Sequence, residues 1–310
     1  MLKQADIRLS RLLPGIIFLV VHVTASAQAD TAMLNMANGK LEVQFDPTPT
    51  AALRKSILDR ITLSAKAVAT YYGRYPVDSV EIWVNFHEGR GINSGHAYGS
   101  PAPHITISVG RSSTEQDFSE DWVTTHEMVH LAFPSVPEQH HWIEEGLATY
   151  IEPIARAQIG ELTPEKVWGD MVEGMPNGMP RAGDRGLDFT HTWGRTYWGG
   201  ALFCLLADIE IRKRTETKRG LEDGMRGILK AGGSIASEWT LAQALETADH
   251  AAGVSVLQEL YSKMRSSPMA PNLETLWDDL GVKIRDGRVE FNNSAPLAQI
   301  RKTITQRIDR

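Results

Sequence analysis

Three stretches in the first part of the chain alternate between apolar and polar residues. They cover residues 41–45, 80–86 and 105–109. A period of two is typical of a strand that buries one face, so we predict a strand in each stretch. Residues 87–103 are rich in Gly, Ser and Pro, and they are predicted to form a loop.

The remaining patterns are mainly helical. Residues 51–72 place apolar side chains near one face, which indicates an amphipathic helix. A second helix, capped by Asp117 or Ser119, is predicted to run to Phe133, where Pro134 ends it. Further helices are predicted over residues 142–158, 194–214 and parts of 220–282, with a loop over residues 174–190.

This order of elements predicts an α+β fold, in which a small β-rich N-terminal part precedes a mainly helical part. The 310 residues suffice for one large domain or two small ones. We divide the chain into an N-terminal α/β part at 28–115, a helical part at 116–282 and a C-terminal tail at 283–310.

The first 27 residues have the layout of a secretory signal peptide. Basic residues precede a short apolar run at 16–21, and a cleavage site follows at Ala25-Ser26-Ala27, with a second option after Ala29. The run is much shorter than the about 20 apolar residues that span a membrane. We therefore expect an exported protein, periplasmic or secreted, with no stable membrane span after cleavage.

Composition excludes other classes of function. The chain is 42% hydrophobic and 23% charged, which is typical of a globular protein. Its formal net charge of −6 gives no electrostatic basis for binding nucleic acid. Cys204 is the single cysteine, so no intramolecular disulfide can form. The oligomeric state stays open.

The sharpest chemical motif is His126-Glu127-Met128-Val129-His130 within the second predicted helix. Spacing of i, i+4 places both imidazoles on one helix face, where they can bind one Zn²⁺ ion. Glu127 is rotated by about 100° from His126, given 3.6 residues per turn. It can therefore take a proton from a water on the metal instead of acting as a ligand.

A catalytic zinc ion usually has three protein ligands and one open position. The helix predicted at 142–158 carries two adjacent carboxylates, Glu144 and Glu145, and either could complete a site with two His and one Glu. His140 and His141 are rival ligands in the preceding loop, where side chains are held less rigidly than on a helix.

These motifs resemble the gluzincin metallopeptidases, the clan of thermolysin and the aminopeptidases. The shared pattern is His126 to His130 followed by Trp142-Ile143-Glu144-Glu145-Gly146-Leu147-Ala148-Thr149-Tyr150-Ile151-Glu152. The resemblance implies a thermolysin-like fold with Zn²⁺ held by His126, His130 and Glu145. It also places Thr149 near the ligands, where it would orient them, and Glu144 is a further candidate for such a role.

A further resemblance lies in Tyr197-Trp198-Gly199-Gly200-Ala201-Leu202, which is similar to a helix of glycyl-aminopeptidase-like enzymes and, more loosely, aminopeptidase N relatives. It implies that Tyr197 donates to the oxyanion that forms on the substrate carbonyl. His191 is a second candidate for assisting there. The strand at 104–109 is expected to be the edge strand beside the substrate cleft, where an extended peptide could pair.

Residues 95–99 occupy the place of the G-x-M-E-N motif of aminopeptidase N relatives, but they contain no Glu. Endopeptidase and aminopeptidase activity therefore both stay open. The sequence predicts a zinc-dependent metallopeptidase with Glu127 as general base, Tyr197 as oxyanion donor, and a peptide or protein as substrate. The alternative is a non-catalytic binding or scaffold protein that zinc stabilises, with a fourth ligand from His140 or His141.

Overall fold

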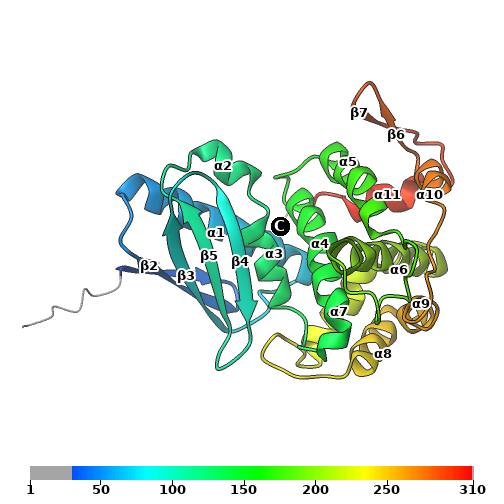
Figure 1. Ribbon diagram of the computed structural model, residues 1–310, viewed down its shortest axis with the longest axis horizontal. Helices are drawn as coiled ribbons and strands as arrows, with labels where there is room; N and C mark the ends of the chain where they lie inside the picture. The colour runs from blue at the N-terminus through cyan, green and yellow to red at the C-terminus, as the bar shows by residue number, and fades with distance from the viewer. Residues whose placement is uncertain (1–29, 309–310) are drawn as a thin grey trace, which may run out of the picture.

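The computed structural model describes residues 30–308. The predicted signal peptide at 1–27 and both of its cleavage sites lie outside these residues. A β-sheet with one long helix forms one end of the molecule, and a group of helices forms the other end (Figure 1). The predicted α+β fold is confirmed, with the sheet in the N-terminal part and mainly helices after it.

The sheet has five strands within residues 30–308, in the order β1-β2-β3-β5-β4. The strands are β1 (Asp30–Met36), β2 (Gly39–Asp46), β3 (Ser79–His87), β4 (Ile92–Tyr98) and β5 (His104–Gly110). β2, β3 and β5 are parallel, whereas β1 and β4 are antiparallel to their neighbours at the two edges. The three predicted strands are thus confirmed as β2, β3 and β5.

The two edge strands were not predicted, because neither contains a fully buried residue and the sequence therefore shows no strong alternation of apolar and polar residues there. β4 lies inside the segment that we predicted to be a loop, and its inner positions are Gly95 and Ala97 rather than large apolar residues. The prediction that residues 104–109 form the edge strand is wrong, since β5 pairs with both β3 and β4. The strand at the edge is β4.

Helix α1 (Ala51–Tyr72) covers the inner face of the sheet and matches its predicted bounds. Its apolar face includes Ile57, Ile61 and Val68, which are fully buried in one core with strand residues such as Ile82 and Ile105. Leucine, isoleucine and valine side chains that leave water in this way supply most of the free energy that stabilises such a layer.

The second predicted helix is divided in two. α2 (Glu115–Glu120) and α3 (Val123–His130) are separated at Asp121, whose backbone is extended. The Asp121 carboxylate accepts hydrogen bonds from the amides of Val123 and Thr124, so it satisfies the free N–H groups at the start of α3. The motif His126 to His130 therefore occupies a short helix with its own beginning.

The helical end of the molecule is built around α4 (His141–Gln158) and α6 (Gly200–Arg214), which pack against each other. The other elements there are η1 (Glu138–His140), α5 (Pro164–Gly174), η2 (Met175–Gly178), the π-helical turn η3 (Arg195–Gly199), α7 (Leu221–Lys230), α8 (Leu241–Ala252), α9 (Val256–Met264) and α10 (Leu273–Leu280).

The predicted tail is structured. It contains most of the hairpin of β6 (Val282–Arg285) and β7 (Arg288–Phe291), followed by α11 (Ala298–Ile304). The chain then returns toward the middle of the molecule, where the amide of Ile308 donates to the carbonyl of Gln158 at the end of α4 (Figure 1). Among residues 30–308, none of the helices has the length and apolar character needed to cross a membrane.

Candidate metal centre

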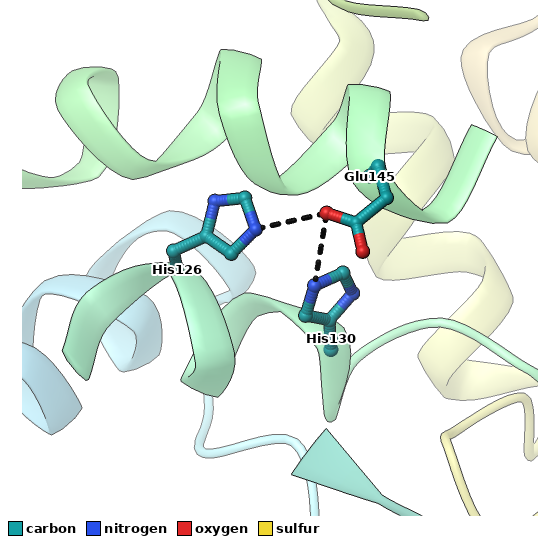
Figure 2. A group of neighbouring side chains, drawn as sticks. All are labelled: His126, His130 and Glu145. Atoms are coloured by element: carbon teal, nitrogen blue, oxygen red, sulfur yellow. Dashed lines mark hydrogen bonds and ion pairs between the residues drawn. The ribbon is translucent and has the colours of Figure 1, made fainter. Parts of the chain in front are cut away.

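Helices α3 and α4 bring two histidines and one carboxylate to the same point. The side chains of His126 and His130 project from α3 toward Glu145 on α4 (Figure 2). Nε2 of His126 lies 3.1 Å from Oε2 of Glu145, and Nε2 of His130 lies 3.7 Å from the same oxygen. The structure therefore assembles the three predicted metal ligands from two separate helices.

The geometry of these atoms fits a zinc ion. One potential ligand atom from each residue lies within 4.8 Å of the others. Three atoms bound tetrahedrally to zinc at about 2.0 Å are roughly 3.3 Å apart, and the two distances above bracket this value. Two imidazole nitrogens and one carboxylate oxygen are also the donor types that zinc prefers.

The carboxylate of Glu145 is strongly stabilised as an anion. Burial opposes its ionisation, but hydrogen bonds from His126, His130 and His141 hold its pKa well below the usual range. Burial lowers the pKa of His126 from its ordinary value. Burial acts in the same direction on His130, but the hydrogen bond with Glu145 outweighs it and raises the pKa of His130. A metal ion requires an ionised carboxylate and neutral imidazoles, so its binding would compete with protonation of His130.

Glu127 points to the sheet side of the centre rather than toward its ligands. Burial raises its pKa to about 7, and a hydrogen bond from the backbone amide of Ala97 in β4 acts in the opposite direction. A Cβ atom at Gly95 would lie 2.5 Å from Cγ of Glu127, so a glycine is required where β4 crosses α3. The sequence analysis considered Gly95 only as part of a segment that differs from the G-x-M-E-N motif, and it did not predict this close contact.

Tyr197 lies on η3, a π-helical turn of a kind that is frequent at functional sites. Its ring stacks on the imidazole of His126 with 6.1 Å between centroids. Burial raises the pKa of Tyr197 to about 12, and the nearby carboxylates of Glu145 and Glu127 add to this shift. The hydroxyl therefore keeps its proton and stays a hydrogen-bond donor at neutral pH.

A backbone contact between two glycines places Tyr197 over the ligands. A Cβ atom at Gly146 would lie 2.4 Å from Cα of Gly200, and a Cβ atom at Gly200 would lie 2.2 Å from the carbonyl oxygen of Trp142. Only glycine allows α4 and the start of α6 to approach so closely. The two glycines explain why the Glu-Gly and Tyr-x-x-Gly patterns occur together in one sequence.

His141 contacts Glu145, but it does not join the group of three ligands. Its Nε2 lies 3.2 Å from Oε1 of Glu145, which is the carboxylate oxygen that faces away from His126 and His130. Its Nδ1 lies 3.0 Å from Oε2 of Glu144, and Oε1 of Glu144 accepts from the amide of Val136. These contacts raise the pKa of His141 to about 10, with Glu144 as the largest cause.

The other predicted site residues lie elsewhere. Nδ1 of His140 lies 2.9 Å from the buried carboxylate of Asp188, so this rival ligand is engaged with a different partner. His191 is exposed to solvent, and no contact brings it to the metal ligands. Thr149 lies one turn after Glu145, and its buried hydroxyl has no hydrogen-bond partner among the described residues. The roles predicted for His191 and Thr149 stay predictions.

A second polar cluster joins the same two helices farther along α4. It is a buried ion-pair network made up of five charged residues, which are Arg60, Asp121, Glu152, Arg156 and Glu161. Arg60 of α1 pairs with Asp121, the residue that caps α3, at 3.2 Å. Arg156 of α4 pairs with Glu152 at 2.8 Å and with Glu161 at 2.7 Å. The network therefore holds α3 and α4 in register.

Comparisons with known proteins identify the fold. Searches found no matching protein-family model and no significant match among curated protein sequences. Solved structures do match. An aminopeptidase N family protein from Idiomarina loihiensis has a TM-score of 0.61 and 12% sequence identity, over 83% of this chain and 50% of that chain.

Two further structures are M1 zinc metallopeptidases. One, from Deinococcus radiodurans, has a TM-score of 0.51 and 14% identity, over 79% of this chain and 53% of that chain. The other is a two-domain M1 zinc metallopeptidase bound to L-arginine, with the same TM-score, identity and coverage. The chain thus spans about half the length of the structures that it matches.

The predicted resemblance to gluzincin peptidases is confirmed at the level of the fold. Identities of 12% and 14% carry no information on activity by themselves. The matches cover about four fifths of this chain. Over that part, the chain has the fold shared by the aminopeptidase N family and M1 zinc metallopeptidases.

Proposed function

We propose that this protein is a zinc-dependent metallopeptidase. The observation that carries the proposal is the convergence of His126, His130 and Glu145 from two helices on one point of the right size for zinc. The same fold in M1 zinc metallopeptidases supports it. When bound, zinc would supply the Lewis acidity that activates water and polarises the carbonyl group of a peptide bond.

The residues of the chain supply the remaining roles. Glu127 accepts a proton from the attacking water and later delivers it to the leaving amine, and a pKa near 7 suits both transfers. The protonated hydroxyl of Tyr197 donates a hydrogen bond to the oxygen that becomes negative as the carbonyl is attacked. His126, His130 and Glu145 would hold the metal, and His141 contacts the other oxygen of Glu145, Oε1.

The substrate class follows from this chemistry as a peptide or protein. One neighbour of the same fold holds L-arginine, and another is described with a Tyr-Ser-Ala substrate. We leave endopeptidase and aminopeptidase activity as alternatives for this chain, because β4 offers no carboxylate side chain that could bind a free amine. A cleavage profile on peptides with free and with blocked N-termini distinguishes the two.

The function is tested by digestion of a peptide pool with the purified protein. We expect cleavage that stops on addition of a chelator and returns when stoichiometric zinc is restored. A hydroxamate inhibitor should bind the zinc-loaded protein, because inhibition needs an open coordination position. Zinc binding without cleavage or hydroxamate binding would instead favour the non-catalytic, zinc-stabilised alternative.

We also propose that the protein is exported, to a periplasm or to the outside of the cell. The support is the arrangement of Lys3, Arg8 and Arg11 before a short apolar run and a small-residue cleavage site. Mass spectrometry of the protein from its natural host should find a mature N-terminus at Gln28 or Asp30. A retained Met1 in the mature protein would contradict this proposal.

A further inference from the structure

Two tryptophans beside the metal centre are unusually exposed, although tryptophan side chains are largely buried on average. Trp193 is 63% exposed and Trp122 is 52% exposed. They are the two most exposed tryptophans among the described residues, and Trp83 follows at 39% on the outer face of the sheet. Tryptophan side chains are enriched at binding interfaces, where they combine a large apolar surface with a polar N–H group.

Both tryptophans contact residues of the proposed active site. The ring of Trp193 stacks on that of Tyr197 with 6.0 Å between centroids, and Tyr197 stacks on His126 at 6.1 Å. Trp122 meets the ring of His126 edge-on at 5.3 Å. Trp122, His126, Tyr197 and Trp193 therefore form a continuous aromatic row. The row passes the metal centre, and both of its ends face solvent.

A cavity of about 430 Å³ lies at the Trp193 end of the aromatic row. This size falls within the range of about 300–1,000 Å³ that is typical of sites for small ligands. Besides Trp193, the residues that line the cavity include Met179, Thr190, Thr192, the exposed Arg181 and the buried pair Arg195–Asp184. Nε of Arg195 lies 2.8 Å from Oδ2 of Asp184, so each charge of this pair is matched.

We propose that Trp193 and this cavity form a subsite for a bulky, apolar side chain of the peptide substrate, next to the bond that is cleaved. The inference rests on the proposed peptidase function and adds a substrate preference to it. An aromatic or large aliphatic side chain would cover the exposed face of Trp193, which removes apolar surface of both partners from water. A basic side chain would find no free carboxylate in the cavity, because Asp184 is already paired with Arg195. Trp122 offers a second, similar contact at the other end of the row.

The test measures binding to the zinc-loaded Glu127→Gln variant by calorimetry, so that no substrate is consumed. The probes are alanine hexapeptides with free ends that carry Phe at each position in turn, each paired with the same peptide carrying Gly there. We expect at least one Phe peptide to bind about tenfold or more tightly than its Gly partner, as burial of a phenylalanine ring predicts. A second substitution, Trp193→Ala, should bring the ratio of the Kd values of the Gly and Phe peptides close to one. Trp193→Phe should keep most of the difference.

The matched control is Trp83→Ala, which removes an exposed tryptophan from the opposite face of the sheet and should leave the ratio unchanged. Equal binding of the paired peptides, no binding of any of them, or an unchanged ratio in Trp193→Ala would overturn the subsite. A Phe preference that depends on Trp193 in a protein whose wild type cleaves nothing would support the subsite and count against the peptidase. Cleavage of peptides without any preference for bulky residues would count against the subsite alone.

Discussion

The metal centre and the ion-pair network join the same two helices, α3 and α4. The negative charges of their carboxylates are neutralised in different ways. In the network, Arg60 and Arg156 pair with Asp121, Glu152 and Glu161, so two cations face three anions. At the metal centre, Glu127, Glu144 and Glu145 lie close together, and no Arg or Lys within residues 30–308 forms an ion pair with any of them.

This difference indicates what each cluster is for. A buried carboxylate is stable only when a positive charge or several hydrogen-bond donors compensate for the water that it loses. In the network the chain supplies that charge itself, so the cluster is complete and structural. At the metal centre only histidines face the carboxylates. His141, whose pKa is raised to about 10, contributes one positive charge, and a divalent cation would supply further positive charge. Substitutions in the two clusters should therefore have different consequences.

The largest expected effect is on catalysis. Glu127→Gln keeps the shape of the side chain but removes the base, so we expect peptide hydrolysis to fall by about 10²- to 10⁴-fold. Because Glu127 is not a proposed ligand, the variant should still bind one zinc ion per chain. Kinetics on a cleaved peptide, together with metal analysis of the same preparation, measure both. Normal hydrolysis by a zinc-loaded variant would show that another group is the base.

In the network, Arg156→Met should mainly affect stability. It leaves Glu152 buried without its cation, and breaking a buried pair in this way lowers the free energy of unfolding by about 3–5 kcal/mol. Arg214→Met is the matched control, because Arg214 pairs with Glu210 and Glu259 at the surface and should contribute about 1 kcal/mol or less. Denaturant unfolding of both variants makes the comparison. Equal losses would contradict a structural role for the network.

A smaller effect is expected at the edge of the metal centre. His141→Ala frees the outer oxygen of Glu145, and loss of a partner that orients a ligand typically weakens metal binding by 10- to 100-fold. His141→Gln can still donate and should recover part of the affinity. His140→Ala is the control, since its partner is Asp188. Competition with a chelating dye measures zinc affinity, and a change of less than twofold in His141→Ala would refute the role.

The smallest expected effect is a change in the free energy of unfolding with pH. Burial raises the pKa of Glu152 to about 7, and Arg156 opposes the shift. The folded carboxyl then binds its proton more tightly than the unfolded one, whose pKa is 4.5. This contribution to stability is full below pH 4.5 and is lost as pH rises through about 7. The Glu152→Gln variant should therefore gain stability relative to wild type between pH 5 and 8, as measured by urea unfolding. A difference that is independent of pH would contradict the shift.

Elements with a strong periodic pattern were predictable from sequence. The bounds of α1 were correct, and α4 begins one residue before its predicted start. The break between α2 and α3 was not predicted, because an acidic residue such as Asp121 is typical of the first turn of a helix. Only its contacts with Arg60 and with the amides of α3 show that it ends one helix and caps another.

The grouping of the candidate ligands was predictable to the extent that it is local. His126 and His130 follow from spacing along one helix, whereas Glu145 was identified through a family resemblance because its approach depends on how α4 packs. His141 was recognised only as a rival ligand, since sequence gives no means to tell which oxygen of Glu145 it would meet. The exposure of Trp193 was not predictable either, because it depends on how the turn that leads into η3 places its ring in solvent.

The close contact of Gly146 with Gly200 has a mechanical consequence. Helices that touch backbone to backbone leave no side-chain layer that could slide, so α4 and the start of α6 behave as one rigid unit. A hinge movement of the β-sheet relative to this unit would change the contact between Ala97 and Glu127. The distance between Tyr197 and Glu145 would stay the same, because both residues move with the unit.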